Sequence, residues 1–406
     1  MGRITSYDET MEINFCADKF VDNKPYPNCA TWDARPYTPE WRQFSVNWPF
    51  SEPVHFYEYL DQENMKYTVR NTSEAAEGSI YPISLSFFDF GVNWFEIIPT
   101  PVVEKIREGR IKLWFFYSEG DNPFRIKKHI ENQCVAHGID IKNVHFTTAN
   151  TKSHDLDGFS YLCDDELLYR LRNEGLIDYH ENPRSKNFTA LVRTHKWWRA
   201  NTMARLWMKG LHEKAYFSYN NSMDVGETPE DNPIEVDSFG SLRHHTEFFL
   251  KLCPFYADLL SSNEHNLYHH TVSAHHDNAY FNFILETHLD VDQSGGVFLT
   301  EKTFKPIKHC QPFVIVGAAG SIQKLRDMGY RTFDHVVNHS YDTIENNTER
   351  WDAVCNEMER IAKSKKIHAM YVACKEDLLH NQQHFLATKR ERLHEFGKQL
   401  HQLATS

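Results

Sequence analysis

Hydrophobic residues in the first half of the chain fall into runs that alternate between the period of a strand and that of a helix. The apolar run 111–117 predicts a buried strand, and the spaced apolar positions of 124–136, which stop before Gly138, predict a helix with a glycine at its end. Another strand is expected at 144–148. Because strands that alternate with helices form parallel sheets, we expect a parallel α/β domain in this half.

The same alternation restarts in the second half of the chain. Its strands are expected at 188–192, 215–219, 280–286 and 312–316, and its helices at 201–209, from Glu301 onward and at 321–328. These elements predict a second Rossmann-like sheet.

The pattern also predicts where the domains divide. A polar segment at 178–187 separates the two alternating regions, and the last stretch spaces its apolar residues as a helix does. We therefore expect one Rossmann-like domain at 1–183, a second at 184–348, and C-terminal helices at 349–406 that pack across both domains. With 406 residues, the chain is long enough for two separate cores.

Composition and motifs narrow the possible functions. The formal net charge of −12 gives no overall attraction for nucleic acid, so a nucleic-acid partner is not favoured. Neither the eight dispersed cysteines nor the histidines within 265–276 form a known metal-binding motif, so no metal site and no cofactor are expected. The chain has no P-loop, no Gly-x-Ser-x-Gly elbow and no Gly-x-Gly-x-x-Gly fingerprint, which disfavours kinase, hydrolase and dehydrogenase functions.

Targeting signals are also missing from the sequence pattern. The first residues lack the apolar core of a signal peptide, and no apolar run approaches the roughly 20 residues of a membrane span. We expect no membrane span and a cytoplasmic location.

The most informative segment is 297–307, VFLTEKTFKPI, where an apolar strand end meets a helix start. Thr300 is a natural N-cap, and a helix N-terminus attracts anions through its free N–H groups and its partial positive charge. Lys302 and Lys305 add full charges that would stabilise a pyrophosphate, and Glu301 is placed to accept hydrogen bonds from ribose hydroxyls. The alternative is an ordinary capped amphipathic helix, shortened or kinked by Pro306.

The string 298–317, FLTEKTFKPIKHCQPFVIVG, resembles the donor-binding segment of the α-1,3-fucosyltransferase family and is similar to related viral and bacterial glycosyltransferases. The resemblance implies a GT-B architecture, in which two Rossmann-like domains face each other across a cleft. The N-terminal domain would then take the acceptor and the C-terminal domain the nucleotide sugar. It also implies that Glu301 and Lys302 bind the ribose and phosphate of a GDP- or UDP-linked sugar. A viral relative would work in the host cytoplasm.

A second cluster of cations follows the strand expected at 188–192. Arg193, Lys196 and Arg199 lie where open α/β sheets place their ligands, and arginine binds phosphate with two parallel hydrogen bonds. The family resemblance implies that Arg193 or Arg199 contacts the donor. Glu286, at the end of another strand, would either contact the ligand or orient these cations. For each residue alone, the alternative is a solvated turn.

Carboxylates in the first half are candidates for the catalytic base. Transfer of a sugar to a hydroxyl group requires a base that removes the hydroxyl proton. Glu119 and Asp121 follow the strand at 111–117 and are our first and second choices, and Asp89 is the third. The alternative for each is a turn residue or a helix N-cap, a role that suits Asp121 before Asn122.

Together these features predict a glycosyltransferase. It would move a sugar from a nucleotide-diphosphate sugar to the hydroxyl group of a glycan or another acceptor, with inversion and without a metal ion. Two alternatives stay open at this point. One is a transferase acting on modified bases of viral DNA, and the other is a non-catalytic protein that binds sugar nucleotides or glycans.

Overall fold

The computed structural model describes residues 12–18, 20–21, 24–25, 55–62, 64–85, 88, 90–117, 119–163, 176–222, 229–234, 242–257, 273–290 and 295–405. The chain divides into two compact units. Unit 1 consists of Met1–Leu167 together with Thr388–Ser406, and unit 2 of Leu168–Ala387. Residues 388–406 thus belong to unit 1, and the part of the C-terminal stretch before them belongs to unit 2.

Unit 1 is built on a six-stranded parallel sheet in the order β4-β1-β5-β6-β7-β8. Its strands are β1 (Ile13–Ala17), β4 (Tyr67–Asn71), β5 (Ser79–Leu85), β6 (Ile111–Tyr117), β7 (Val144–Thr148) and β8 (Phe159–Tyr161). A separate antiparallel pair is formed by β2 (Phe20–Val21) and β3 (Lys24–Pro25). The strands β6 and β7 have the bounds that the apolar pattern predicts.

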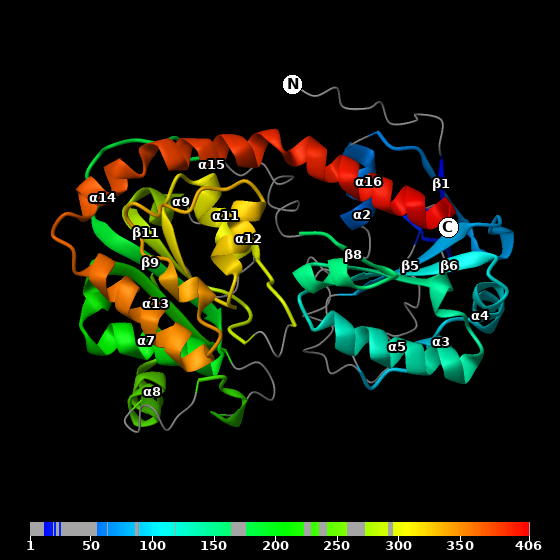
Figure 1. The fold of residues 1–406 in the computed structure, drawn as a ribbon, viewed down its shortest axis with the longest axis horizontal. Helices are drawn as coiled ribbons and strands as arrows, with labels where there is room; N and C mark the ends of the chain where they lie inside the picture. The colour runs from blue at the N-terminus through cyan, green and yellow to red at the C-terminus, as the bar shows by residue number, and fades with distance from the viewer. Residues whose placement is uncertain are drawn as a thin grey trace. The chain divides into compact units, whose positions relative to one another are not determined.

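Helices cover both faces of this sheet, as Figure 1 shows. One face carries α2 (His55–Gln62) and α16 (Lys389–Thr405), and the other carries α3 (Trp94–Ile97), α4 (Thr100–Arg107) and α5 (Pro123–His137). Coverage on both sides explains why every residue of β6 is buried. Aromatic contacts add to the core: the rings of Phe115 and Phe146 stack with their centroids 4.6 Å apart.

Unit 2 is built on a four-stranded parallel sheet in the order β10-β9-β11-β12. Its strands are β9 (Lys186–Thr194), β10 (Ala215–Ser222), β11 (Ala279–Leu285) and β12 (Phe313–Val316). Its helices are α7 (Trp197–Met208), α8 (Leu242–Leu252), α9 (Ser273–Asp277), α11 (Glu301–Lys308), α12 (Ser321–Asp327), α13 (Asn347–Ala362), α14 (Ile367–Ala373) and α15 (Lys375–Ala387).

The strand order of unit 2 determines where a ligand site is expected. The chain runs from β9 outward to β10 on one side, and from β11 outward to β12 on the other. The helices that follow these two central strands therefore cover opposite faces, with α7 and α13 on one face and α11 and α15 on the other (Figure 1). The carboxyl ends of β9 and β11, where the two connections diverge, are the position at which open α/β sheets bind ligands.

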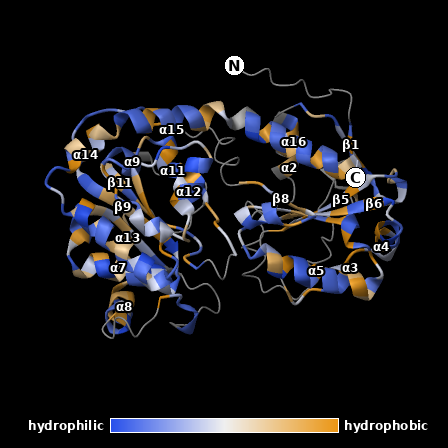
Figure 2. Cartoon of the chain, in the orientation of Figure 1, coloured by the Kyte–Doolittle hydropathy of each residue, from blue (hydrophilic) through white to orange (hydrophobic). Residues whose placement is uncertain are grey.

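The two sheets with their C-terminal helices confirm the predicted α/β class. Figure 2 shows the apolar residues concentrated along the strands of both sheets, in agreement with their burial. Among the described residues, no helix combines the length and the apolar character that crossing a bilayer requires.

Candidate functional site

Arg199 joins the carboxyl ends of the two central strands of unit 2. The helix α7 begins at Trp197, four residues earlier than the sequence pattern predicts, so Arg199 lies in its first turn. The guanidinium donates hydrogen bonds from Nε and Nη2 to the backbone oxygen of Glu286, at 3.1 and 2.6 Å, and from Nη1 to the backbone oxygen of Thr194, at 3.3 Å. The side chain is buried, which places a full positive charge at the switch point of the sheet.

The start of α7 concentrates positive charge. Lys196 is the N-cap residue of this helix, and its first turn contains no acidic residue. Helices ordinarily carry acidic residues at this end, because the macrodipole is positive there. Two cations, Lys196 and Arg199, therefore add to the partial charge of the N-terminus, and an anion bound at this point would balance them. Arg193, at the end of β9, is half-buried and lies on the same strand-to-helix connection.

Glu286 follows β11 and fixes the start of α11. Its fully buried carboxylate accepts hydrogen bonds from the backbone N–H of Thr300 (3.1 Å), from Thr300 Oγ1 (2.6 Å) and from Thr303 Oγ1 (2.5 Å). Buried carboxylates are tolerated when several donors stabilise them in this way. The backbone oxygen of Glu286 thus holds Arg199, and its carboxylate holds the first turn of α11.

The first turn of α11 also carries an ion pair, next to the hydrogen bonds that Glu286 accepts. Thr300 is the N-cap, as the sequence predicts, and its Oγ1 accepts hydrogen bonds from the backbone N–H of Lys302 (3.4 Å) and from Lys302 Nζ (3.0 Å). Lys302 Nζ also lies 3.2 Å from Glu301 Oε1. Burial would raise the pKa of the Glu301 carboxyl, but Lys302 and Lys305 outweigh this effect and the pKa is lowered. Glu301 is thus an ionised acceptor at a cationic helix start.

His288 was missed by the sequence reasoning, although it lies two residues after Glu286. Its ring packs against Phe298, with centroids 5.9 Å apart. Burial lowers the pKa of His288 to about 3, and the charges of Lys196, Arg199 and Lys302 contribute to this shift. The cations at the starts of α7 and α11 therefore both act electrostatically on the His288 ring. The available signal was the position of a histidine just after a strand at the switch point of the sheet.

Two of the three candidate bases lie together at the end of β6 in unit 1. Asp121 Oδ2 accepts a hydrogen bond of 2.6 Å from the hydroxyl group of Tyr117, and Glu119 is half-buried nearby. Burial raises the pKa of Tyr117 far above its usual value, and both carboxylates add to this effect. The N-cap of α5 is Asn122, which accepts hydrogen bonds from the backbone N–H groups of Phe124 and Arg125. The capping role considered for Asp121 is therefore wrong.

Some predicted residues lie outside the described ranges. They include the third candidate base, Asp89, and the histidines His265 and His269. Within the described ranges, no group of three or more His, Cys, Asp or Glu side chains could hold a metal ion.

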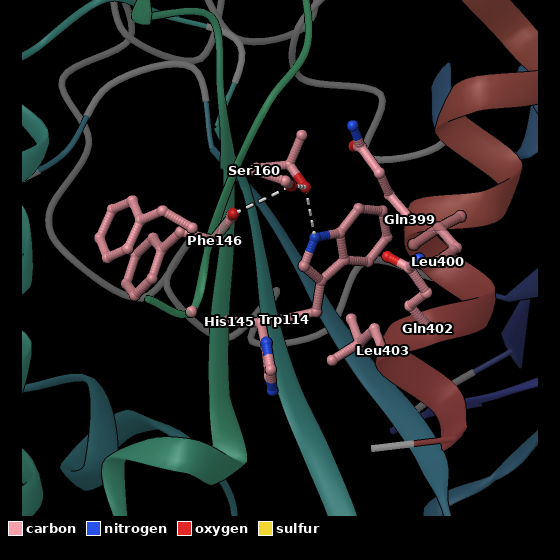
Figure 3. Close-up of a pocket in the computed structure, with 11 residues that line it drawn as sticks. Trp114, His145, Phe146, Ser160, Gln399, Leu400, Gln402 and Leu403 are labelled. Atoms are coloured by element: carbon pink, nitrogen blue, oxygen red, sulfur yellow. Dashed lines mark hydrogen bonds between the residues drawn. The ribbon is translucent and has the colours of Figure 1, made fainter. Parts of the chain in front are cut away.

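Unit 1 also contains a pocket of about 240 Å³ between the edge of its sheet and α16 (Figure 3). Figure 3 shows the indole of Trp114 between the strands and the side chains of Leu400 and Leu403. Trp114 Nε1 donates a hydrogen bond of 2.9 Å to Thr147 Oγ1, which lies 2.9 Å from Ser160 Oγ. The residues that line this pocket do not include any of the predicted site residues.

Comparisons with known proteins give matches among solved structures alone. No protein-family model and no curated protein matches the chain, so the resemblance to α-1,3-fucosyltransferases stays a prediction based on its motif residues. The chain is similar to T4 phage β-glucosyltransferase in complex with UDP and Mn²⁺, with 12% identity, a TM-score of 0.40, and coverage of 96% of this chain and 99% of that chain. A mutant of the T4 enzyme in complex with UDP-glucose matches with 11% identity, a TM-score of 0.42 and the same coverage.

A structure described as the DNA-modifying enzyme β-glucosyltransferase, with and without uridine diphosphoglucose, matches with 10% identity and a TM-score of 0.42, over 96% of this chain and 99% of that chain. Because these TM-scores are below 0.5, the functional assignment below rests on the geometry of the site.

Proposed function

We propose that the chain is a glycosyltransferase whose unit 2 binds a nucleotide-diphosphate sugar. The observation that carries this proposal is the convergence of two cationic helix starts on the switch point of one parallel sheet. The start of α7 supplies Lys196 and Arg199, and the start of α11 supplies Lys302. A diphosphate is the ligand group that this arrangement of side-chain charges and helix N-termini fits best.

Each part of the site then has a role in the transfer. As the bond between the sugar and the diphosphate breaks, negative charge develops on the departing phosphate, and Arg199 and Lys302 stabilise it. Lys305 and Arg193 add charge at the border of the site. The ionised Glu301 accepts hydrogen bonds from the ribose hydroxyls. Because the protein itself supplies this many cations, the reaction as proposed requires no metal ion.

The acceptor hydroxyl is activated by a carboxylate of unit 1 in this proposal. Glu119 is our first choice and Asp121 the second, since both follow the carboxyl end of β6. The activated oxygen attacks the anomeric carbon of the donor in a single displacement. The configuration at that carbon is therefore inverted.

The test begins with Lys302→Ala. We expect this variant to lose most of its turnover while keeping its fold, because it removes a charge that stabilises the departing diphosphate. Lys365→Ala is the matched control, since this exposed lysine of unit 2 lies in the connection between α13 and α14. A panel of UDP- and GDP-linked sugars is first screened by thermal shift, because a ligand of the native state raises its apparent stability. The donor that binds is then used to measure turnover.

Three outcomes are decisive. Near-full activity of Lys302→Ala would contradict the proposal. Donor binding by the wild type without transfer or hydrolysis would identify a non-catalytic sugar-nucleotide-binding protein. Competition of duplex DNA with other acceptors would indicate that the acceptor is DNA.

A further inference from the structure

His288 lies two residues after Glu286, at the carboxyl end of the sheet of unit 2, and the proposed transfer assigns it no role. It follows β11 closely, in the connection that leads to α11, and the ring of Phe298 packs against it at 5.9 Å. Its Nδ1 atom is buried and has no hydrogen-bond partner in the described part of the chain. Buried polar atoms of this kind are rare, because the loss of hydration is left uncompensated.

The cations that help to lower the pKa of this ring come from separate elements. Lys196 comes from the N-cap of α7, Arg199 from the first turn of the same helix, and Lys302 from the first turn of α11. Hydrogen bonds independently tie two of these elements to the strand before His288: Arg199 binds the backbone oxygen of Glu286, and Thr300 binds its carboxylate. The ring thus lies where both helix starts are anchored.

The ring is neutral in this setting. Burial, followed by the three neighbouring cations, lowers its pKa to about 3. A neutral imidazole has one N–H group that donates and one nitrogen that accepts. The N–H group can therefore donate a hydrogen bond to an anion that these cations attract.

We propose that His288 is a donor-binding residue, whose ring N–H donates a hydrogen bond to an oxygen of the diphosphate at the point where the three cations converge. This inference rests on the proposed function, because it assigns a residue to the same diphosphate site. It also gives a role to the buried Nδ1 atom, which has no hydrogen-bond partner among the described residues. Residues retained for binding commonly lower the stability of the free protein, and removing them raises it.

The test compares three variants of the full chain. His288→Phe keeps the ring shape and removes the donor, whereas His288→Asn keeps a donor. His335→Phe is the matched control, because His335 is an exposed histidine of unit 2. UDP and GDP binding is measured by titration calorimetry, and the thermal midpoint is measured without ligand.

We expect His288→Phe to weaken binding of the nucleoside diphosphate by ~10-fold or more, the usual effect of losing a hydrogen bond to a charged group. Its thermal midpoint should stay equal to that of the wild type or rise. His288→Asn should stay within ~3-fold of wild-type affinity, and His335→Phe should bind as the wild type does. A merely structural histidine would instead show a lower midpoint with unchanged affinity.

Wild-type protein with ¹⁵N-labelled histidine gives a readout that does not depend on any variant. Addition of the diphosphate should shift the ring nitrogen signals of His288, and unshifted signals would overturn the inference. Unchanged affinity of His288→Phe, with a wild type that binds the diphosphate, would overturn the role of His288 alone. A wild type that binds neither UDP nor GDP would overturn the proposed function as well.

Discussion

The two units carry the same kind of sheet but opposite charge at the carboxyl ends of their strands. In unit 1, β6 leads to Glu119 and Asp121, whereas in unit 2, β9 leads to Lys196 and Arg199. A parallel sheet brings its strand ends to one edge in both cases. The residues just after each strand therefore decide the chemistry: one edge is suited to proton removal and the other to binding an anion.

The units also differ in their buried histidines. In unit 2, burial lowers the pKa of His276, His288, His309 and His339. In unit 1, burial lowers the pKa of His145 to about 4. Both ring nitrogens of His309 are buried, and neither has a hydrogen-bond partner among the described residues. Most of the buried imidazoles named here, which acid must protonate, lie in unit 2.

The largest expected effect is a loss of turnover, caused by a change at the strand ends of unit 1 and not at those of unit 2. Glu119→Gln in unit 1 should lower turnover by about 10²–10⁴-fold, the usual contribution of a general base. Affinity for the nucleotide sugar should stay at the wild-type value, because this residue belongs to the acidic edge. Asp121→Asn should have a smaller effect, since the Tyr117 hydroxyl already binds its carboxylate. Steady-state kinetics and calorimetry check this prediction.

Weaker donor binding by Glu119→Gln, with unchanged turnover at saturating donor, would contradict the proposal that unit 1 supplies the base and unit 2 binds the donor. Full activity of both variants would remove the end of β6 as the source of the base.

Much of the fold is visible in the sequence because its central strands are continuous apolar runs. The strands β6 and β7 match their predicted bounds, and α5 ends at Gly138 as expected, with φ at 64°. By contrast, β1 and β4 gave no clear pattern. They pair side by side over a long sequence separation, with Ile13 opposite Tyr67, and a local period cannot reveal such a contact.

The site was predicted less completely than the fold. Thr300, Glu301 and Lys302 occupy the helix start that their pattern indicates. The early start of α7 was missed because Trp198 and Arg199 are not helix-start residues by type. Tertiary contacts decide the matter: Trp198 is buried, and Arg199 is anchored to strand-end carbonyls. His288 was missed for the same reason, since its surroundings come from distant segments.

An acid titration should distinguish the two units by stability. A histidine has a pKa of about 6.5 in an unfolded chain, and burial lowers the pKa of His309 to about 3 in the native state. Its contribution to stability is therefore complete above about pH 6.5 and is lost as the pH falls toward the native pKa. At about pH 5 the loss amounts to ~2 kcal/mol for this residue alone. Unit 2 should open before unit 1.

Hydrogen exchange of amides in β11 and β6, followed between about pH 6.5 and pH 5, measures the stability of the two units separately. His309→Leu should reduce the acid sensitivity of unit 2 and leave that of unit 1 unchanged. An equal rise in amide exchange of β11 and β6 as the pH falls would contradict the prediction that unit 2 opens first.

The smallest expected effect is a loss of stability on removing a helix N-cap, and it can be compared between one cap in each unit. Thr300 caps α11 and Asn122 caps α5, and each side chain accepts a hydrogen bond from the first turn of its helix. Replacing either residue with alanine should lower the free energy of unfolding by ~1 kcal/mol.

If the start of α11 binds the diphosphate, Thr300→Ala should also weaken nucleotide binding. The hydroxyl group of Thr300 donates a hydrogen bond to Glu286 and accepts one from Lys302, so both side chains depend on it for their positions. Asn122→Ala should leave binding unchanged. Denaturation and calorimetry on the two variants test this difference, and equal binding by both would show that the cap of α11 has no role beyond that of an ordinary helix start.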